Sequence, residues 1–448
     1  MAGSVGVDVG AGGNHAVPVS FYMARDAAQG IAFPGWAGPL HRIDADVERV
    51  VADLLDLDDG IFQMNWLLPE YIQDMLPDEA WRIEGIRRDV LELLRRSGYQ
   101  LVSPPLLEYA ESLLINDSAD MDLRSFKLVD QLSGRTLALR ADITPQVARI
   151  DAHLLNCQGV TRLCYAGSVL HTQPAGLMRT REPLQIGAEL YGHSGIESDL
   201  EVQRLMLQAL ALMGIQGVHL DLGHVGVFRA LVQSAEIPQE LEAELFNALQ
   251  RKDVPALRGL VSGLPQKVQT ALLALPQLYG GVEVITRART ALAAYPEVMT
   301  ALNELEQAAA HLKNLAGDIG IDLAELRGYH YHSGMVFAVY HAGSHDAIAL
   351  GGRYDDVGKA FGRARPATGF SMDLRQLHGL LAKQVQPQGI HAPYRQDAAL
   401  DAAIAKLREQ GEIVVVDLLG KAEYHRELNC NRELVLRDGK WVVVEMKI

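Results

Sequence analysis

Gln185 and Glu189 are a pair of residues whose types and spacing indicate a binding site. They lie four positions apart in the run 184–191, whose composition predicts a β-strand. Side chains at this spacing project from the same face of a strand, so an amide and a carboxylate would share one space. A buried carboxylate without a partner is costly. Glu189 therefore indicates either a bound cationic ligand or an internal ion pair, for instance with Arg140 or Arg179.

Histidines and cysteines supply little evidence for a metal. His330 and His332 are two positions apart on a possible strand, which would give half of a metal site, but no third ligand lies near them in the sequence. The three cysteines, Cys157, Cys164 and Cys430, form no CxxC pair, so neither a zinc site nor a disulfide framework is indicated. We therefore expect no metal and no cofactor.

The composition is that of a globular protein with an acidic balance. Of 448 residues, 48% are hydrophobic and 22% are charged, and 41 Lys+Arg against 56 Asp+Glu give a formal net charge of −15. RNA-binding proteins usually present a basic face, so this balance argues against nucleic acid as a main partner. No apolar run reaches the ~20 residues that span a bilayer, and no signal peptide is evident. We expect a cytoplasmic protein without membrane contact.

A regular pattern of helices and strands begins at Met64 and predicts a domain over residues 64–382. Apolar residues recur at helical spacing from Asp78 to Arg96, which predicts a helix with Asp78 as its cap. Further helices are predicted at 144–155 and 199–213, and strands at 126–130, 136–140, 163–169, 184–191, 217–222, 334–340 and 347–350.

Two further parts interrupt and follow this domain. Residues from about 225 to 318 are almost wholly helical and rich in Ala and Leu, without a strand signal, which predicts a helical insertion. Residues 383–394 are rich in Pro, Gln and Gly and are typical of a linker. A helix at 397–409, a strand at 412–417 and a hairpin at 433–445 then predict a small α/β unit, so residues 383–448 form a linker and this unit.

The first 63 residues differ from the rest. Gly dominates the first dozen positions, and only residues 44–57 have helical periodicity. Residues 1–63 are either a genuine extension or the product of a start codon assigned too far upstream. Their low complexity and the lack of a core pattern favour the second interpretation.

Four segments, in order, resemble histidyl-tRNA synthetases, which are class II aminoacyl-tRNA synthetases. They are YQLVSPPLLEY (99–109), similar to the dimer-forming first motif; RLCYAGSVLHTQPAGLMRTREPLQIGAELYG (162–192), the second motif; ELRGYHYHSGMVFAVY (325–340), a segment peculiar to the histidine enzymes; and GGRYDDVGKAFGRARPATGFSMDLRQL (351–377), the third motif. The resemblance runs from Leu67 to about Leu380. It implies an α+β fold with a mainly antiparallel sheet flanked by helices.

The residues that hold ATP in the active enzymes are absent from both nucleotide motifs. His171 and Gln173 stand where the family carries Arg and Glu, and Gln376 stands where the third motif ends in Arg. Such clamps carry most of adenylyl transfer, and a mostly uncharged imidazole offers no bidentate fork. The alternative is rescue by Arg179 or Arg375, which would have to restore two clamps at once. We expect no catalytic residue.

The amino-acid pocket of the family is better preserved. The resemblance implies that Asp142 and Thr144 meet the α-ammonium group of histidine. It also implies that Gln185 meets the α-amino or carboxylate end and that Glu189 meets the imidazole. Arg327 matches the arginine that pairs with the substrate carboxylate in the active enzymes.

The imidazole end of this pocket departs from the family pattern. Where the family has two adjacent tyrosines, this chain has Tyr331 and His332, so the ligand would be held differently or more weakly. The complete set of predicted histidine-binding residues is Asp142, Thr144, Gln185, Glu189, Arg327 and Tyr331.

A synthetase-like core without ATP clamps resembles a second family, the regulatory subunits of ATP phosphoribosyltransferase. The segments DLRSFKLVDQLSGRTLALRADITPQVARIDAHLL (122–155) and ELRGYHYHSGMVFAVYHAG (325–343) carry this resemblance. The chain beyond Leu380 is also shorter than a synthetase's anticodon-binding domain.

This second resemblance implies a non-catalytic chain that senses L-histidine and acts at the first step of histidine biosynthesis. Its partners would be a short-form catalytic subunit, in a hetero-oligomer, and a second copy of itself. A divergent histidyl-tRNA synthetase and an RNA-binding synthetase paralogue are the alternatives. The net acidity and the short C-terminal part count against both.

Overall fold

The structure is a computed structural model that describes residues 67–113, 119–174, 176, 179–382, 387–420 and 427–446. The predicted extension over residues 1–63, with its helical segment 44–57, lies outside the described residues.

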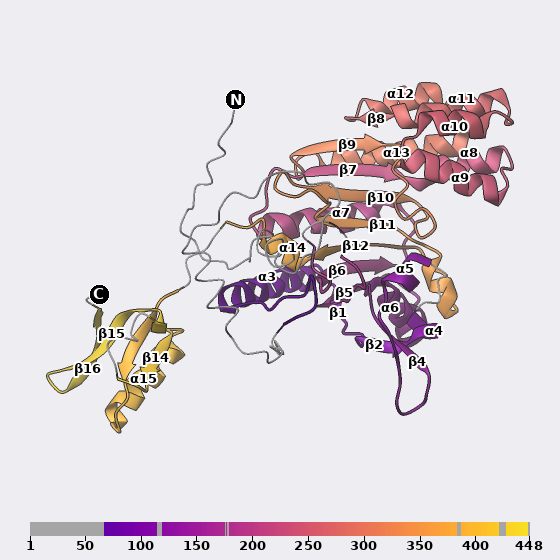
Figure 1. Ribbon diagram of the computed structural model, residues 1–448. Helices are drawn as coiled ribbons and strands as arrows, with labels where there is room; N and C mark the ends of the chain where they lie inside the picture. The colour runs from indigo at the N-terminus through magenta and orange to yellow at the C-terminus, as the bar shows by residue number, and fades with distance from the viewer. Residues whose placement is uncertain are drawn as a thin grey trace, which may run out of the picture. The chain divides into compact units, whose positions relative to one another are not determined.

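A nine-stranded sheet forms the centre of the fold (Figure 1). In spatial order its strands are β1 (Gln100–Leu101), β5 (Thr161–Ser168), β6 (Leu184–Tyr191), β12 (Ala367–Asp373), β11 (Ala349–Arg353), β10 (Met335–Tyr340), β7 (His219–His224), β9 (Asp318–Asp322) and β8 (Tyr279–Gly280). Only the β1–β5 and β7–β9 pairs are parallel among these strands. The predicted α+β fold with a mainly antiparallel sheet is confirmed.

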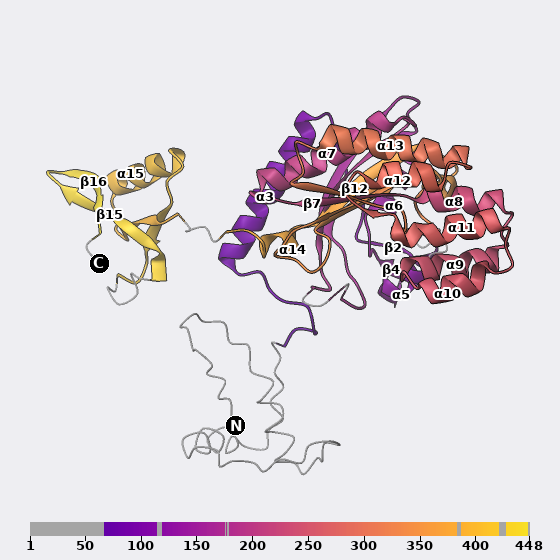
Figure 2. The same ribbon diagram turned by 90° about the horizontal axis from the view of Figure 1, so that it is seen from above.

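Long helices cover one face of this sheet. Helices α3 (Pro77–Arg96), α7 (Ile196–Leu212) and α13 (Pro296–Leu312) pack side by side over it (Figure 2). Because side chains alternate along β5, Cys164 points into this helix-covered core while Leu163 points to the opposite face. The opposite face is covered in part by α6 (Thr144–Arg149), which continues as a π-helix over Ile150–Leu155.

The start of α3 differs from the prediction. The helix begins at Pro77, and Leu76 occupies the N-cap position without a side-chain hydrogen bond, so Asp78 is not the cap. Proline at the first helical position supplies a preset φ angle and lacks only an N–H that would be unpaired there anyway. Asp78 lies in the first turn instead.

A small three-stranded sheet packs beside the main one. It is formed in the order β2 (Leu107–Tyr109), β4 (Thr136–Leu139) and β3 (Lys127–Val129), and all pairs are antiparallel. The short helices α4 (Ala110–Leu113) and α5 (Ala119–Arg124) precede β3.

The segment between β7 and β9 is built almost entirely of helices, here called the helical insertion. They are α8 (Val225–Ser234), α9 (Gln239–Gln250), α10 (Val254–Val261), α11 (Gln266–Ala274), a 3₁₀ turn (Leu275–Gln277), α12 (Val284–Ala291) and α13. The expectation of no strand in this segment is wrong at β8, whose two residues pair with β9. Two residues are too few to produce a strand periodicity in the sequence.

The C-terminal part folds as a four-stranded sheet with one helix. The strand order is β14 (Val414–Asp417), β13 (Gly389–Pro393), β15 (Cys430–Arg437) and β16 (Lys440–Glu445), and α15 (Ala398–Glu409) packs on it. The predicted linker at 383–394 is wrong where it includes β13, which is buried and pairs in parallel with strands on both sides. Asp438 and Gly439 form the hairpin turn, both with positive φ, as predicted.

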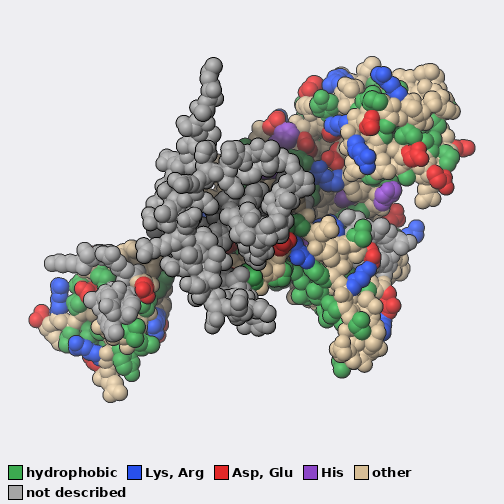
Figure 3. All heavy atoms as spheres, in the orientation of Figure 1, with side chains coloured by type: hydrophobic (Ala, Val, Ile, Leu, Met, Phe, Trp, Pro, Cys, Tyr) green, Lys and Arg blue, Asp and Glu red, His purple; other side chains and the backbone are tan. Residues whose placement is uncertain are grey.

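The described surface gives no sign of a membrane span. In the ranges that the structure covers, no helix is long and apolar enough to cross a bilayer. Basic and acidic side chains are interspersed over the described part of the face seen in Figure 3.

Candidate functional site

Glycines on neighbouring strands create the space for the candidate site. The strand register places Glu189 of β6 beside Gly369 of β12, which in turn lies beside Gly352 of β11. A Cβ atom at Gly369 would overlap the carboxyl group of Glu189, and one at Gly352 would collide with the ring of His332. These two glycines therefore let polar side chains lie flat on the sheet.

Hydroxyl groups surround the Glu189 carboxyl. Glu189 is 1% exposed, its Oε1 lies 3.0 Å from the Tyr165 hydroxyl, and its Oε2 is hydrogen-bonded to the Tyr354 hydroxyl. Thr144 Oγ1 lies 3.1 Å from the Tyr165 hydroxyl, and the Tyr191 hydroxyl lies 3.3 Å from that of Tyr354. The result is one connected network around a buried carboxyl group.

Burial dominates the electrostatics of this network. It raises the pKa of Glu189 to about 8, although the hydrogen bonds from Tyr354 and Tyr165 act in the opposite direction. The ion pairs considered from the sequence are not formed. Arg140 donates to the carbonyls of Pro104 and Ser168 instead, and Arg179 also lies elsewhere. Without a ligand, burial therefore favours the protonated form of Glu189.

Gln185, Asp142 and Thr144 meet at the other end of the site. Gln185 Nε2 donates to Asp142 Oδ1 over 2.7 Å, and the Thr144 backbone N–H donates to the same oxygen over 3.0 Å. The Ile143 N–H donates to Gln185 Oε1 over 2.9 Å, which fixes the amide orientation. Thr144, the first residue of α6, therefore joins the two ends of the site: its N–H donates to Asp142, and its hydroxyl contacts Tyr165.

Tyr331 reaches the same network from a different part of the chain. Its ring centre lies 5.2 Å from that of Tyr354. Its hydroxyl oxygen is buried and has no hydrogen-bond partner among the described residues. Buried polar atoms are nearly always paired, so an unpaired hydroxyl beside a buried carboxyl indicates a place for a ligand group or a water molecule.

Arg327 is the one predicted residue that the structure does not bring into contact with this network. Its guanidinium group donates to the Tyr340 hydroxyl over 2.9 Å and lies 3.3 Å from the carboxylate of Glu325, and its side chain is exposed. The other five predicted residues belong to one set of connected contacts.

Three tyrosines of the network were missed in the sequence: Tyr165, Tyr191 and Tyr354. Tyr191 lies two positions after Glu189 on β6, and Tyr165 faces Gly187 across the β5–β6 pair. Alternation along these strands could have placed both on the Glu189 face. Tyr354 follows β11 within the third motif, but its contact with Glu189 depends on strand pairing that the sequence does not reveal.

The two positions expected from the sequence to replace ATP-holding arginines, His171 and Gln376, have protein partners. His171 is 5% exposed, and its Nε2 lies 2.9 Å from the carbonyl oxygen of Ala141. Gln376, in α14 (Leu374–His378), donates to the Ser344 hydroxyl and the Ala347 carbonyl, each over 3.2 Å.

The arginines considered as substitutes are each next to a carboxylate. Arg179 lies 3.3 Å from Asp346 and donates to the side-chain oxygen of Gln376. Arg375 lies 3.3 Å from Glu182. Their positive charges are thus partly neutralised within the protein.

The two histidines considered as metal ligands have different neighbours. The His330 ring packs against Phe246 at 5.3 Å, whereas His332 packs edge-on against Tyr331 at 5.2 Å. Burial lowers the pKa of His332 to about 4, so it is neutral at physiological pH. Over the described ranges, no group of three His, Cys, Asp or Glu side chains could hold a metal ion.

The raised pKa of Glu189 predicts a pH dependence of stability. Because the folded pKa of about 8 exceeds the ordinary value of 4.5, the folded protein binds more protons than the unfolded chain between these values. The free energy of unfolding should therefore fall with rising pH in this window, by about 1.4 kcal/mol per pH unit. Glu189→Gln should remove this contribution. Urea denaturation of both proteins at several pH values tests it, and parallel stability curves would contradict the assignment.

The fold and site define the chain as a class II, histidyl-tRNA synthetase-like protein. Residues 71–377 match the family model described as histidyl-tRNA synthetase, and residues 387–444 match the C-terminal domain of the ATP phosphoribosyltransferase subunit HisZ. The ATP phosphoribosyltransferase regulatory subunit of Nitrosospira multiformis is 59% identical over 388 residues, which are 86% of this chain and 99% of that protein. That of Ralstonia nicotianae is 58% identical, with 86% and 99% covered. The chain belongs to the family of ATP phosphoribosyltransferase regulatory subunits.

Solved structures share the fold of this chain. A Bacillus halodurans protein, described as an ATP phosphoribosyltransferase regulatory subunit/histidyl-tRNA synthetase, superposes with a TM-score of 0.70 at 29% identity and covers 80% of this chain and 94% of its own. The histidyl-tRNA synthetase of Nostoc sp. PCC 7120 has a TM-score of 0.68 at 17% identity, with 85% and 97% covered, and shows the shared fold.

Proposed function

We propose that this chain is the non-catalytic regulatory subunit of ATP phosphoribosyltransferase and that L-histidine binds in its Glu189 network. In this role it activates a short-form catalytic subunit at the first step of histidine biosynthesis in the cytoplasm, and histidine inhibits the assembled complex. The observation that carries the ligand is the buried Glu189 carboxyl. Its partners within the described residues are hydroxyl groups and include no cationic side chain.

The two ends of the network suit the two ends of histidine, the imidazole ring and the α-ammonium group. An imidazole N–H or an imidazolium can donate to Glu189, and the buried Tyr331 hydroxyl gains a partner when a ligand enters. Asp142 and Gln185 supply acceptors for an α-ammonium group at the far end. Arg327 would have to leave Tyr340 to reach the ligand carboxylate, so its part in binding requires a movement of its side chain.

The contacts of His171, Gln376 and the two neighbouring arginines support a chain without synthetase activity. His171 and Gln376 are bonded to protein groups, and Arg179 and Arg375 are each beside a carboxylate. A phosphate-holding clamp needs positive charge aimed at developing negative charge, which these side chains do not offer. Self-association is proposed through the segment 99–109, which would form an interface between identical copies.

Reconstitution with the purified catalytic subunit tests this function. Adding the chain should raise the rate of phosphoribosyl transfer strongly, and histidine should then inhibit the mixture. The isolated chain should show histidine-dependent ATP–pyrophosphate exchange at least ~100-fold below that of an active synthetase, the scale of losing one transition-state clamp. If the chain changes neither the rate nor the histidine response, the regulatory function is wrong. Exchange at synthetase rates would instead identify an enzyme.

A further inference from the structure

One short segment connects the Glu189 network, formed by Glu189 and the hydroxyl groups around it, to the helical insertion. We call residues 327–334 the tyrosine segment. Tyr329 and Tyr331 lie two positions apart in it and contact different parts of the fold. Tyr331 packs on Tyr354 in the Glu189 network. Tyr329 is 4% exposed and packs between Phe228 of α8 and Phe246 of α9, at ring-centre distances of 5.2 and 5.6 Å.

Arg229 of α8 ties the backbone of this segment to the insertion. Its guanidinium group donates to the carbonyl oxygens of Tyr329 (3.4 Å), His332 (3.0 Å) and Ser333 (3.2 Å). These carbonyls flank Tyr331 on both sides. The guanidinium carbon also lies 5.2 Å from the ring centre of Tyr329, within the range of a cation–π contact.

A second bond from the insertion reaches the same segment. The Tyr329 hydroxyl donates to Glu242 of α9 over 2.7 Å. Helices α8 and α9 therefore hold Tyr329 through its ring, its hydroxyl and its carbonyl group. Because Tyr331 is only two residues away, any displacement of these helices must either break the contacts or move Tyr331 relative to Glu189.

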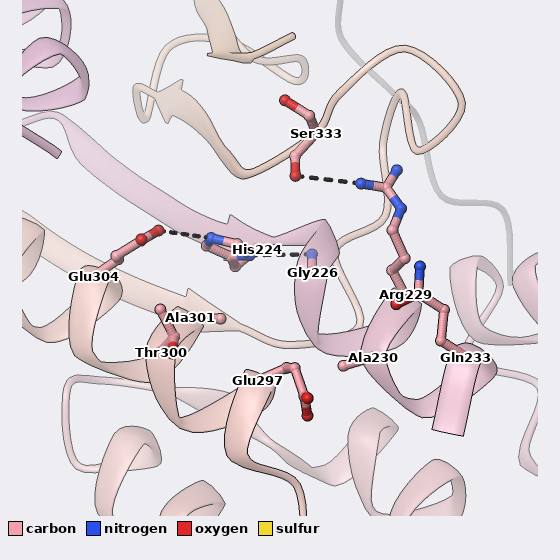
Figure 4. Close-up of a pocket in the computed structure, with 10 residues that line it drawn as sticks. All are labelled: His224, Gly226, Arg229, Ala230, Gln233, Glu297, Thr300, Ala301, Glu304 and Ser333. Carbon is pink, nitrogen blue, oxygen red and sulfur yellow. Dashed lines mark hydrogen bonds and ion pairs between the residues drawn. The ribbon is translucent and has the colours of Figure 1, made fainter. Parts of the chain in front are cut away.

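The contact between Arg229 and the segment borders an open cavity (Figure 4). The cavity has a volume of about 190 Å³ and is lined by residues of α8 and α13 together with His224 of β7 and Ser333. In Figure 4, Arg229 extends from α8 toward the Ser333 backbone, and the bonded pair His224 and Glu304 lies across the cavity. Because Ser333 lines this cavity, water can replace the Arg229 bond to the Ser333 carbonyl if Arg229 is shortened, so we expect a variant at this position to fold.

We propose that Arg229 is a positioning residue that holds Tyr331 over the Glu189 network and thereby couples histidine binding to the helical insertion. This inference rests on the proposed function, because it assigns the regulation of that same site. Coupling of this kind is reciprocal: if the insertion fixes the affinity for histidine, then bound histidine must in turn stabilise the insertion against local opening.

The test is a double-mutant cycle on the full chain assembled with its catalytic subunit. Calorimetry measures the dissociation constant of L-histidine for wild type, Arg229→Gln, Tyr331→Phe and the double variant. Arg229→Gln alone should weaken binding by about tenfold, the scale of one lost charged hydrogen bond. In the Tyr331→Phe background it should weaken binding by less than about threefold, because the group through which it acts is already gone.

A matched control separates this effect from a general loss of charge. Arg289 of α12 is on the same insertion and bonds only to Glu306 in the described structure, over 2.7 Å, so Arg289→Gln should leave histidine affinity unchanged. Arg229→Lys can make fewer of the three carbonyl bonds and should restore affinity only in part.

A second measurement uses the unmodified protein and does not depend on any variant. Hydrogen exchange of the assembled wild type, with and without histidine, should show slower amide exchange in α8 and α9 when histidine is bound.

The outcomes distinguish this inference from the proposed function. Wild type that binds no histidine overturns both. Wild type that binds histidine while Arg229→Gln binds equally well, or loses the same factor in both backgrounds, overturns only the role of Arg229. Unchanged exchange in α8 and α9 on binding overturns the coupling to the insertion.

Discussion

Glu189→Ala should raise the histidine concentration for half-maximal inhibition of the reconstituted complex by about 10- to 150-fold. This range corresponds to about 1.5–3 kcal/mol, the contribution of a hydrogen bond between Glu189 and a charged imidazolium group. The expectation follows from the position of Glu189, which is 1% exposed and bonded only to hydroxyl groups among the described side chains. The measurement is the phosphoribosyl transfer rate over a series of histidine concentrations.

A control on α7 makes this result specific. Glu197 is an exposed glutamate that lies 3.1 Å from the exposed His193, so Glu197→Ala removes a carboxylate without touching the network. Its inhibition curve should match that of wild type. The rate without histidine, compared among the three proteins, reports whether assembly persists. Equal inhibition of Glu189→Ala and wild type would place the histidine site elsewhere.

Arg353→Met should lower the free energy of unfolding by about 3–5 kcal/mol, because it leaves Asp199 buried without its charged partner. The two side chains are 9% and 3% exposed, and Arg353 Nη2 lies 2.7 Å from Asp199 Oδ2. Arg353 also donates to the Ser198 hydroxyl over 2.7 Å and to the Gly195 carbonyl over 3.1 Å. Urea denaturation followed by circular dichroism measures the loss.

A partly exposed ion pair serves as the control for the effect of burial on the loss of stability. Arg162 and Glu201 are 2.7 Å apart but 35% and 23% exposed, so Arg162→Met should cost about 1 kcal/mol or less. Adding Asp199→Leu to Arg353→Met should recover part of the lost stability, because no buried charge then remains unpaired. Similar losses at Arg353 and Arg162 would show that burial does not set the strength of the Arg353 pair.

The elements with local signals were predictable from the sequence. The helical periodicity of α3 and the composition of β6 gave their positions to within one residue. By contrast, the sequence predicts a linker where β13 lies, because residues 383–394 are rich in Pro, Gln and Gly. The assignment of β13 depends on parallel pairing with β14 and β15, which lie later in the chain and leave no local pattern.

The candidate site was predictable to a similar extent and for similar reasons. Glu189 and Gln185 could be placed together because both lie on one strand. The contact of Glu189 with Tyr354 joins β6 to the residue that follows β11, a strand distant from β6 in the sequence. The bond of Arg327 to Tyr340 depends on the conformation of the loop that carries Arg327. Spacing on a single element could reveal neither.

The placement of Glu189 on β6 also bears on how the protein folds. Its partner Tyr354 is 165 positions away, and the whole helical insertion lies between them in the chain. Contacts at such separations carry a large loop-closure entropy and form late. During synthesis the network can therefore be completed only after β11 and β12 have left the ribosome. Any ligand of this network would bind only after the whole sheet has formed. It would therefore raise the free energy of unfolding of the entire core and not of its N-terminal half alone.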